Sequence, residues 1–117
     1  MGKIIVKIGV DVMEDLKRIK ENPRVYGNPG GHTIYLKDSK QLYALLSPKR
    51  IDLLRQIISY GEKSTIGSIT RQSMRKQEAI SRDITMLESA GLVEKKRHRR
   101  NVHLKVPCKA IEIRLAD

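Results

Sequence analysis

Apolar and polar residues follow two different periods along the chain, and the changes of period predict where strands and helices begin. Residues 3–10 are rich in β-branched side chains, which is typical of a strand. After Asp11, apolar residues recur at helical spacing as far as residue 21, and Asp11 with Glu14 resembles a capping box. Residues 22–31 contain two prolines and three glycines, so we expect a loop there.

A second strand and a second helix follow this loop. Residues 32–36 alternate between polar and apolar side chains and predict a short strand. Asp38 and Gln41 form another candidate capping box, and leucines follow them at helical spacing up to residue 46. The first part of the chain therefore has the predicted order strand, helix, strand, helix.

Three further helices are predicted between residues 47 and 90. The first begins at Ser47-Pro48, because serine can cap free backbone N–H groups and proline suits the first helical position. Its expected apolar stripe is Ile51, Leu54 and Ile58, with Leu53 and Ile57 beside it. Thr65 can cap a shorter second helix. The third helix, at about 75–90, repeats apolar residues at i, i+4 and i+7: Ile80, Ile84 and Leu87.

The remaining residues predict strands. A strand begins at Leu92-Val93, a basic loop follows, and Val102, Leu104 and Val106 alternate in the returning strand, so residues 95–105 form a basic wing. Residues 111–115 alternate again in a final strand. The fold class that this order predicts is α+β. It consists of a winged helix-turn-helix domain at residues 47–117, which includes the final strand, and an N-terminal strand-helix-strand-helix extension at residues 1–46.

Composition narrows the class of protein. The 117 residues include thirty-two Ile, Leu and Val but no Phe or Trp, which is enough aliphatic volume for one core. Cys108 is the only cysteine, so we expect neither a disulfide framework nor a zinc cluster. No apolar run is long enough for a membrane span or a secretory signal. We therefore expect a cytoplasmic protein.

Positive charge is concentrated in the second half of the chain. The formal net charge is +11, of which residues 48–117 contribute +8. Residues 95–105 contain six lysines and arginines and no acidic residue. A surplus of this size attracts polyanions, and the basic run lies between strand-like segments, which favours a folded loop over a solvated tail.

Residues 80–94 resemble winged-helix transcriptional regulators. The residues that carry this resemblance are Ile80-Ser81-Arg82-Asp83-Ile84, Leu87 and Ala90-Gly91-Leu92-Val93-Glu94, a pattern similar to the MarR-like and ArsR-like groups. More narrowly, Leu45-Leu46-Ser47-Pro48-Lys49-Arg50 resembles a small family of archaeal and bacterial winged-helix regulators with a Ser/Thr-Pro-Lys-Arg helix start. That family also ends in an apolar strand after Val-Pro, as Val106-Pro107 and residues 111–115 do here.

The chain departs from that family at two places. Family members carry Leu then Gly at the turn before the recognition helix, where this chain has Ser73 and Met74. Methionine is a poor replacement for glycine where a positive φ is required, so we expect an altered turn. Members also commonly have acidic wings, and the basic wing of this chain strengthens the expectation of DNA contact.

The predicted recognition helix and wing supply the candidate DNA-binding residues. Gln77, Ser81 and Thr85 share a face opposite the apolar stripe, with Arg82 alongside, and Gln77, Ser81 and Arg82 are the expected readers of base edges in the major groove. Arg75 and Lys76 are expected to contact phosphates. The wing is expected to contact the backbone or the minor groove through five residues: Lys96, Arg97, His98, Arg99 and Arg100.

The hypothesis from the sequence is a sequence-specific, double-stranded DNA-binding regulator, a nucleoid-associated repressor or autorepressor that acts as a homodimer. Residues 1–47 together with the C-terminal strand could supply the dimer interface. Within them, residues 3–21 are the expected additional interface, although their apolar side chains could instead pack within their own domain. The alternatives are an RNA-binding winged-helix protein and an antitoxin-like protein-interaction module. We expect no enzyme activity, cofactor, metal or small-molecule ligand, because His98, His103 and Cys108 match no zinc spacing and no carboxylate pair has a catalytic context.

Overall fold

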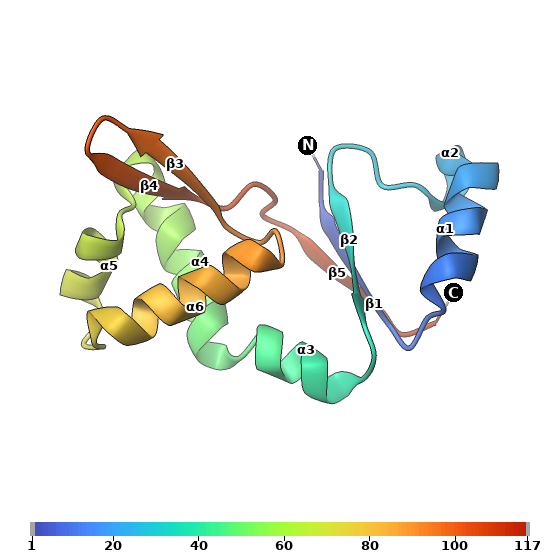
Figure 1. Cartoon of the computed structure of the whole chain (residues 1–117), viewed down its shortest axis with the longest axis horizontal. Coiled ribbons are helices and arrows are strands. Elements are labelled where there is room, and N and C mark those ends of the chain that lie inside the picture. Colours follow the sequence, from blue (N-terminus) through green and yellow to red (C-terminus); the bar gives the residue numbers. More distant parts are fainter. Residues whose placement is uncertain (1, 117) are drawn as a thin grey trace. The chain divides into compact units, whose positions relative to one another are not determined.

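Strand β1 (Ile4–Ile8) lies at the centre of a three-stranded sheet in the computed structural model, which describes residues 2–116 (Figure 1). Its neighbours are β2 (His32–Leu36) on one side and β5 (Ile111–Arg114) on the other, and both pair with it in parallel. Helix α1 (Val12–Glu21) and the single turn α2 (Pro23–Tyr26) connect β1 to β2. Together with most of α3 (Ser39–Leu45), these elements form the unit that we call the sheet unit, which comprises residues 1–44 and 108–117.

The assignment of the final strand to the second domain is wrong. Residues 111–114 pair with β1, in the register Ile4↔Ile111 and Val6↔Ile113, and therefore belong to the sheet unit. The local alternation of this strand predicts its existence but not its partner, which lies about a hundred residues earlier in the chain. The boundary between the first four elements and the rest falls between residues 44 and 45, close to the predicted 46/47.

Residues 22–31 also differ from the expected loop. Pro23 occupies the first turn of α2, and Gly27 ends this helix by donating its N–H to the carbonyl of Pro23 at 2.9 Å. A proline at this position loses no helical hydrogen bond, so a sequence rich in proline and glycine can still form one turn. None of the four residues of α2 is buried.

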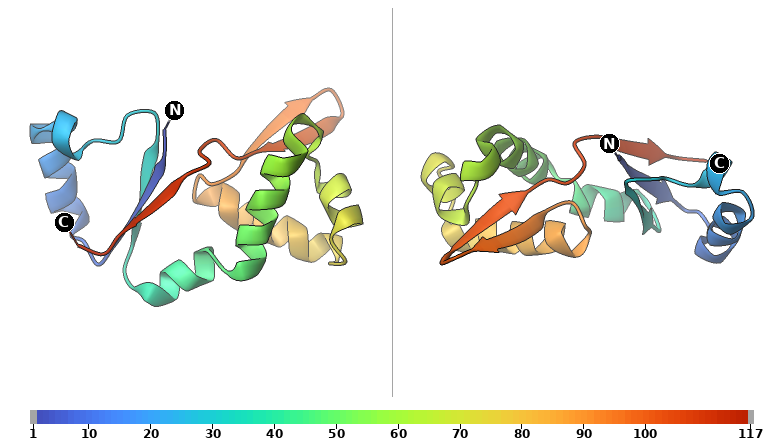
Figure 2. Two further views of the ribbon diagram at one scale, coloured as in Figure 1. Left: turned by 180° about the vertical axis from the view of Figure 1, so that it is seen from behind. Right: turned by 90° about the horizontal axis from the view of Figure 1, so that it is seen from above.

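The second unit, residues 45–107, is called the helical unit here. It contains α4 (Pro48–Tyr60), a 3₁₀ turn η1 (Gly61–Lys63), α5 (Ile66–Gln72), α6 (Gln77–Ser89) and the antiparallel hairpin β3 (Glu94–His98) and β4 (Asn101–Lys105). Figure 2 shows these elements from two further sides. The caps form as predicted, because the Ser47 hydroxyl accepts the Arg50 N–H and Thr65 forms a reciprocal capping box with Ser68.

The core of the helical unit is aliphatic. The buried apolar side chains on its three helices are Leu53, Leu54, Ile57, Ile69, Ile80, Ile84 and Leu87. The predicted stripe of α4 is shifted, since Ile51 and Ile58 are exposed while Leu53 and Ile57 are buried. Beyond the helices, Leu92, Val93 and Leu104 are also buried.

Strand β4 is flanked on both sides. Besides its pairing with β3, it forms an antiparallel bridge between Thr65 and His103, and the Leu104 N–H donates to the carbonyl of Ser64 at 2.8 Å. The hairpin is thereby attached to the segment that joins α4 to α5. The whole chain is a mixed α/β protein, as the strand and helix patterns predict.

Candidate nucleic-acid interface

Helix α6 has a buried side and an opposite exposed side. Ile80, Ile84 and Leu87 are completely buried, which confirms the predicted core stripe. On the opposite side, residues at the same i, i+4, i+7 and i+11 spacing are all exposed: Glu78, Arg82, Thr85 and Ser89. Arg82 thus lies at the middle of the outward face of α6, which is defined here by these four residues.

The other two predicted readers lie on a flank of α6. Gln77 is exposed in the first turn, while Ser81 is half-buried and its carbonyl accepts the Thr85 hydroxyl at 2.9 Å. Glu88 continues the same flank and forms an ion pair with Lys95 of β3 at 3.4 Å. This contact attaches the C-terminal end of α6 to the start of the hairpin. Ser81, which was expected on the face opposite the apolar stripe, is only partly exposed.

Arg75 is held within the fold. Its Nη2 atom donates to Oδ2 of Asp83 at 2.6 Å, and Nε of Arg50 donates to Oδ1 of the same carboxylate at 3.2 Å. Asp83 is 8 % exposed, so two arginines neutralise a nearly buried charge. Arg75 was expected to contact phosphate, but in the structure it joins the turn before α6 to α6 itself. Lys76, the N-cap residue, is exposed.

Sequence reasoning missed the role of Asp83. This residue lies between Ile80 and Leu87 on the buried side of α6, where a carboxylate needs a partner. Its position in the helical period was a readable signal that α6 must meet basic residues from elsewhere in the unit. By tying Arg50 of α4 and Arg75 to α6, Asp83 orients the outward face.

The turn between α5 and α6 needs no left-handed residue. Among residues 2–116, Arg99 is the only residue other than glycine with a positive φ, so Met74 does not take the glycine conformation. Ser73 ends α5 with its N–H donated to the Ile69 carbonyl, and Met74 is fully exposed. Ser73 and Met74 therefore form this turn without a positive φ.

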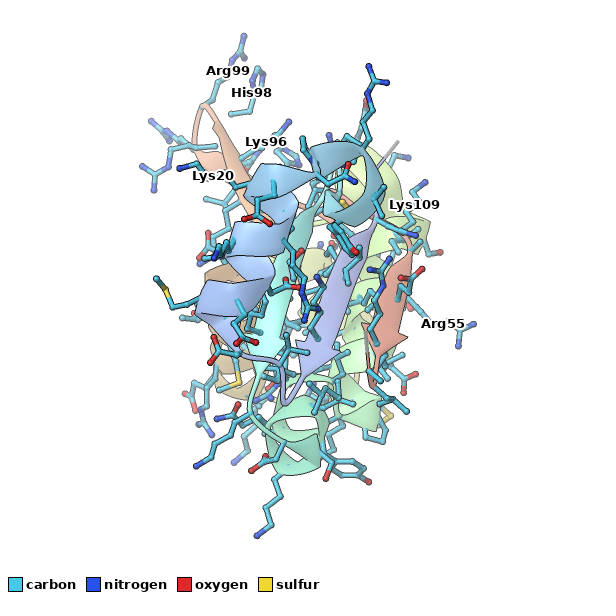
Figure 3. All side chains as sticks on the ribbon, turned by 90° about the vertical axis from the view of Figure 1, so that its right-hand side faces the viewer. Lys20, Arg55, Lys96, His98, Arg99 and Lys109 are labelled. Carbon is cyan, nitrogen blue, oxygen red and sulfur yellow. The ribbon has the colours of Figure 1, made fainter. Side chains whose placement is uncertain are left out.

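The basic segment is a hairpin with a two-residue tip. Residues 95–98 and 101–105 lie in paired strands, and only Arg99 and Arg100 form the turn, so most of the basic run is strand. All five residues of β3 are exposed. Figure 3 shows Lys96, His98 and Arg99 extending from this hairpin.

Arg99 has a φ of 57°, which is uncommon for a residue with a side chain. Glycine or asparagine is preferred in such turns, and other residues there cost about 1 kcal/mol or more. The chain instead places two arginines side by side at the tip. Arg99 in this conformation lowers the stability of the turn, and the two arginines concentrate positive charge at the exposed tip of the hairpin.

Most cations of the helical unit have no acidic partner. The unit contains fourteen basic and six acidic side chains, a net charge of +8. Arg50, Arg75 and Lys95 form ion pairs. Within the described part of the chain, no ion pair involves Arg82, Lys96, Arg97, Arg99 or Arg100. These charges are free to meet an external anion.

The sheet unit contains a buried polar cluster of a different kind. Nζ of Lys7 donates to both carboxylate oxygens of Asp15 at 2.8 and 2.6 Å, and the Tyr35 hydroxyl donates to Oδ2 at 2.6 Å. Burial opposes ionisation of Asp15, but the hydrogen bonds and the positive charge of Lys7 hold its pKa below the ordinary value. Burial and the Asp15 carboxylate raise the pKa of Tyr35 to about 12. Every member of the cluster has a partner within the unit, so the cluster fastens α1 to the sheet.

Metal-ligating residues do not gather in the part of the chain that the structure describes. His98 lies near the hairpin tip, whereas Cys108 is buried in the sheet unit. Over the same residues, no helix combines the length and the apolar character needed to cross a membrane.

The architecture defines a mixed α/β protein with a small parallel sheet and a basic helical unit. The profile of the HVO_A0114 family matches residues 45–113, more than half of the chain, and the chain belongs to this family. The match covers the helical unit and most of β5, but it does not include β1, the sheet partner of β5. No curated protein matches the chain.

Proposed function

We propose that the helical unit is a winged helix-turn-helix domain that binds double-stranded DNA in a sequence-specific manner. Helices α4, α5 and α6 followed by the β3–β4 hairpin have the order of such a domain, and the bridge at Thr65 supplies its short additional strand. In this interpretation α6 is the recognition helix and the hairpin is the wing. The chain would act as a homodimeric repressor or autorepressor on the nucleoid.

One observation carries this proposal. The outward face of α6 and the hairpin tip display arginines without acidic partners, and the Lys95–Glu88 ion pair connects the two elements. The major groove of DNA is wide enough to admit α6, and the guanidinium of Arg82 can donate two hydrogen bonds to guanine. The exposed Gln77 can pair with adenine through its amide. Arg97, Arg99 and Arg100 would neutralise phosphates beside the groove or enter a narrow minor groove.

Repression would follow from occupation of the site. A dimer bound across a promoter excludes polymerase without any chemical step, so no catalytic residue is required. The surplus of +8 on the helical unit would provide the sequence-independent part of the affinity, which decreases steeply with salt.

Selection of bound sites from random duplex DNA tests the proposal. We expect a defined motif, and we expect the duplex to bind more tightly than RNA of the same sequence at the same salt, because the major groove of RNA is too narrow for a helix. A tighter complex with RNA would favour the RNA-binding alternative. Recovery of random sequences only would contradict sequence-specific recognition.

The matched substitutions are Arg82→Ala and Arg55→Ala. Both remove one arginine from the helical unit, but Arg55 lies on α4 and extends away from the hairpin tip (Figure 3). Arg82→Ala should cost about 1–3 kcal/mol on the selected site and relax discrimination at one base pair. Arg55→Ala should leave the motif unchanged. Equal weakening by Arg82→Ala on selected and random duplexes would reduce Arg82 to a phosphate contact.

A further inference from the structure

Strand β5 forms an open edge of the parallel sheet. The right-hand view of Figure 2 shows it as the outermost strand, beside β1. Its apolar side chains remain exposed, at 36 % for Ile111, 45 % for Ile113 and 78 % for Leu115. Natural sheets protect such an edge with charged side chains, a short strand, a proline, a bulge or a covering element. Residues 111–115 contain no proline, and the two charged residues of this strand, Glu112 and Arg114, lie on its half-buried side.

The hydrogen-bonding pattern shows which backbone groups face outward. The Ile4 N–H donates to the carbonyl of Ala110 at 2.9 Å, while Ile4 is in register with Ile111. In a parallel ladder a residue bonds to the two neighbours of its register partner, so the backbone groups of residues 110 and 112 face β1. The N–H and C=O groups of Ile111 and Ile113 consequently point toward the open edge.

The polar side chains of β5 make the edge self-complementary. Glu112 and Arg114 lie on the opposite side of the strand from Ile111 and Ile113, and both are half-buried. Hydrogen bonds from Lys3 and Arg114 hold the pKa of Glu112 below its ordinary value, so this carboxylate is charged at neutral pH. An antiparallel partner strand aligned at Ile113 would place each Glu112 opposite an Arg114, and each Ile111 opposite a Leu115.

Other alignments of this edge with itself are less favourable. Centring the pair on residue 112 would bring two glutamates together, and centring it on residue 114 would bring two arginines together. Directly opposed like charges destabilise a strand pair. An alignment centred on Ile111 would place Ile113 against Lys109. The Ile113 alignment therefore combines outward-facing backbone groups, apolar neighbours and opposite charges.

We propose that a second copy of this chain adds to the edge, with β5 of each copy antiparallel about a two-fold axis at Ile113. The two sheets become one sheet of six strands, and the same surface of each copy forms the interface, as a closed dimer requires. This inference gives the homodimer of the proposed function its interface. The inference rests on the homodimer of that proposal, but it does not depend on DNA binding.

Two other surfaces of the sheet unit are weaker candidates. The opposite edge strand β2 has all five residues half-buried. Helix α1 exposes Met13 and part of Leu16, and residues 3–21 were the interface expected from the sequence. The α1 surface offers no unpaired ladder and no register that matches opposite charges, so we use it as the control.

Sedimentation of the full chain without DNA, over a dilution series, tests the interface. The wild-type chain should be a dimer. Glu112→Arg alone and Arg114→Glu alone should each raise the dimer dissociation constant about tenfold or more, because like charges then face each other twice. An equimolar mixture of the two variants should recover the dimer to within about threefold of the wild-type value, because the two arginines of one chain then face the two glutamates of the other.

Further variants separate this interface from other outcomes. Ile113→Lys should abolish the dimer, and Leu16→Lys on α1 should leave it intact. Loss of the dimer with Leu16→Lys but not with Ile113→Lys would move the interface to α1 and overturn the proposal. The proposal would also be overturned if the two charge variants failed to complement each other while circular dichroism showed both to be folded. A monomeric wild-type chain would refute the dimer, yet site selection would still test DNA binding.

Discussion

Arg99 is the residue at which stability and the proposed function conflict most clearly. Its φ of 57° would suit glycine or asparagine better, yet the chain keeps a long cationic side chain there. Strained residues of this kind cluster at functional sites, which makes Arg99 a candidate for the proposed DNA contact. In the proposed complex, Arg99 and Arg100 would contact phosphates from the hairpin tip.

The substitutions Arg99→Gly and Arg99→Asn should therefore separate the two properties. Both residues tolerate a positive φ, so the free energy of unfolding should stay unchanged or rise by up to about 1 kcal/mol. DNA affinity should fall for every duplex, and the slope of log affinity against log salt should decrease by about one phosphate contact. Titrations at several salt concentrations, together with thermal unfolding, measure both effects. An unchanged salt slope would show that the tip does not touch DNA.

At the scale of the element, a polar cluster attaches α1 to its sheet. Asp15 is 2 % exposed and bonded to Lys7 and Tyr35, whereas Val12 and Leu16 of the same helix are exposed at 40 % and 49 %. A buried ion pair of this kind stabilises only while both partners keep their charge states and hydrogen bonds. The attachment of α1 should accordingly depend on pH.

The pKa shifts give the direction of this dependence. Tyr35 ionises only near pH 12 in the fold, compared with about 10 in an unfolded chain, so its contribution is complete below pH 10 and is lost as the pH rises through 12. The pKa of Asp15 is lowered, so its contribution is complete above the unfolded value of about 3.9 and is lost as the pH falls further. Denaturant unfolding between pH 2 and 12 should show both losses.

Tyr35→Phe isolates the alkaline part of this prediction. The variant loses a hydrogen bond to a charged group, and we expect a cost of about 1–3 kcal/mol at neutral pH and a smaller loss between pH 10 and 12. Tyr43→Phe is the control, because Tyr43 is 71 % exposed on α3 and should cost almost nothing. If the alkaline loss of stability persisted unchanged in Tyr35→Phe, it would have to arise from another group.

At the scale of the whole molecule, the helical unit is an insertion in the sequence between β2 and β5, two strands of the same sheet. The chain leaves the sheet after β2, forms residues 45–107, and returns as β5 beside β1. The matched family region ends inside β5. This strand pairs with β1 in the sheet unit and, in our proposal, joins two copies of the chain. One recognition helix reads only a few base pairs, and two related copies double the length of the site.

A dimer of this kind should select a palindrome. The half-sites of helix-turn-helix dimers lie about 10–10.5 base pairs apart, centre to centre, because both recognition helices approach one face of the duplex. Inserting about five base pairs between the half-sites should lower the affinity to that of a single half-site, since one helix then faces the far side. Binding that is insensitive to this insertion, measured by gel shift, would contradict simultaneous reading by two copies.

Features set by neighbouring residues could be predicted from the sequence alone. Asp11, Ser47 and Thr65 cap the helices that follow them, and Ile80, Ile84 and Leu87 are buried, because capping and helical period depend on residues only a few positions apart. The concentration of charge in the hairpin was equally visible, since counting residues requires no fold. The exposed positions of Arg82 and Arg99 followed from the same local patterns.

Only the tertiary structure decided which distant residues meet. It paired β5 with β1, engaged Arg75 with Asp83, paired Lys95 with Glu88 and buried Lys7 against Asp15 and Tyr35. In each case a local pattern shows that a strand, an ion or a polar group needs a partner. The identity of that partner depends on how the chain returns in space, because hydrogen bonds and ion pairs form between neighbours in three dimensions, whatever their separation in sequence.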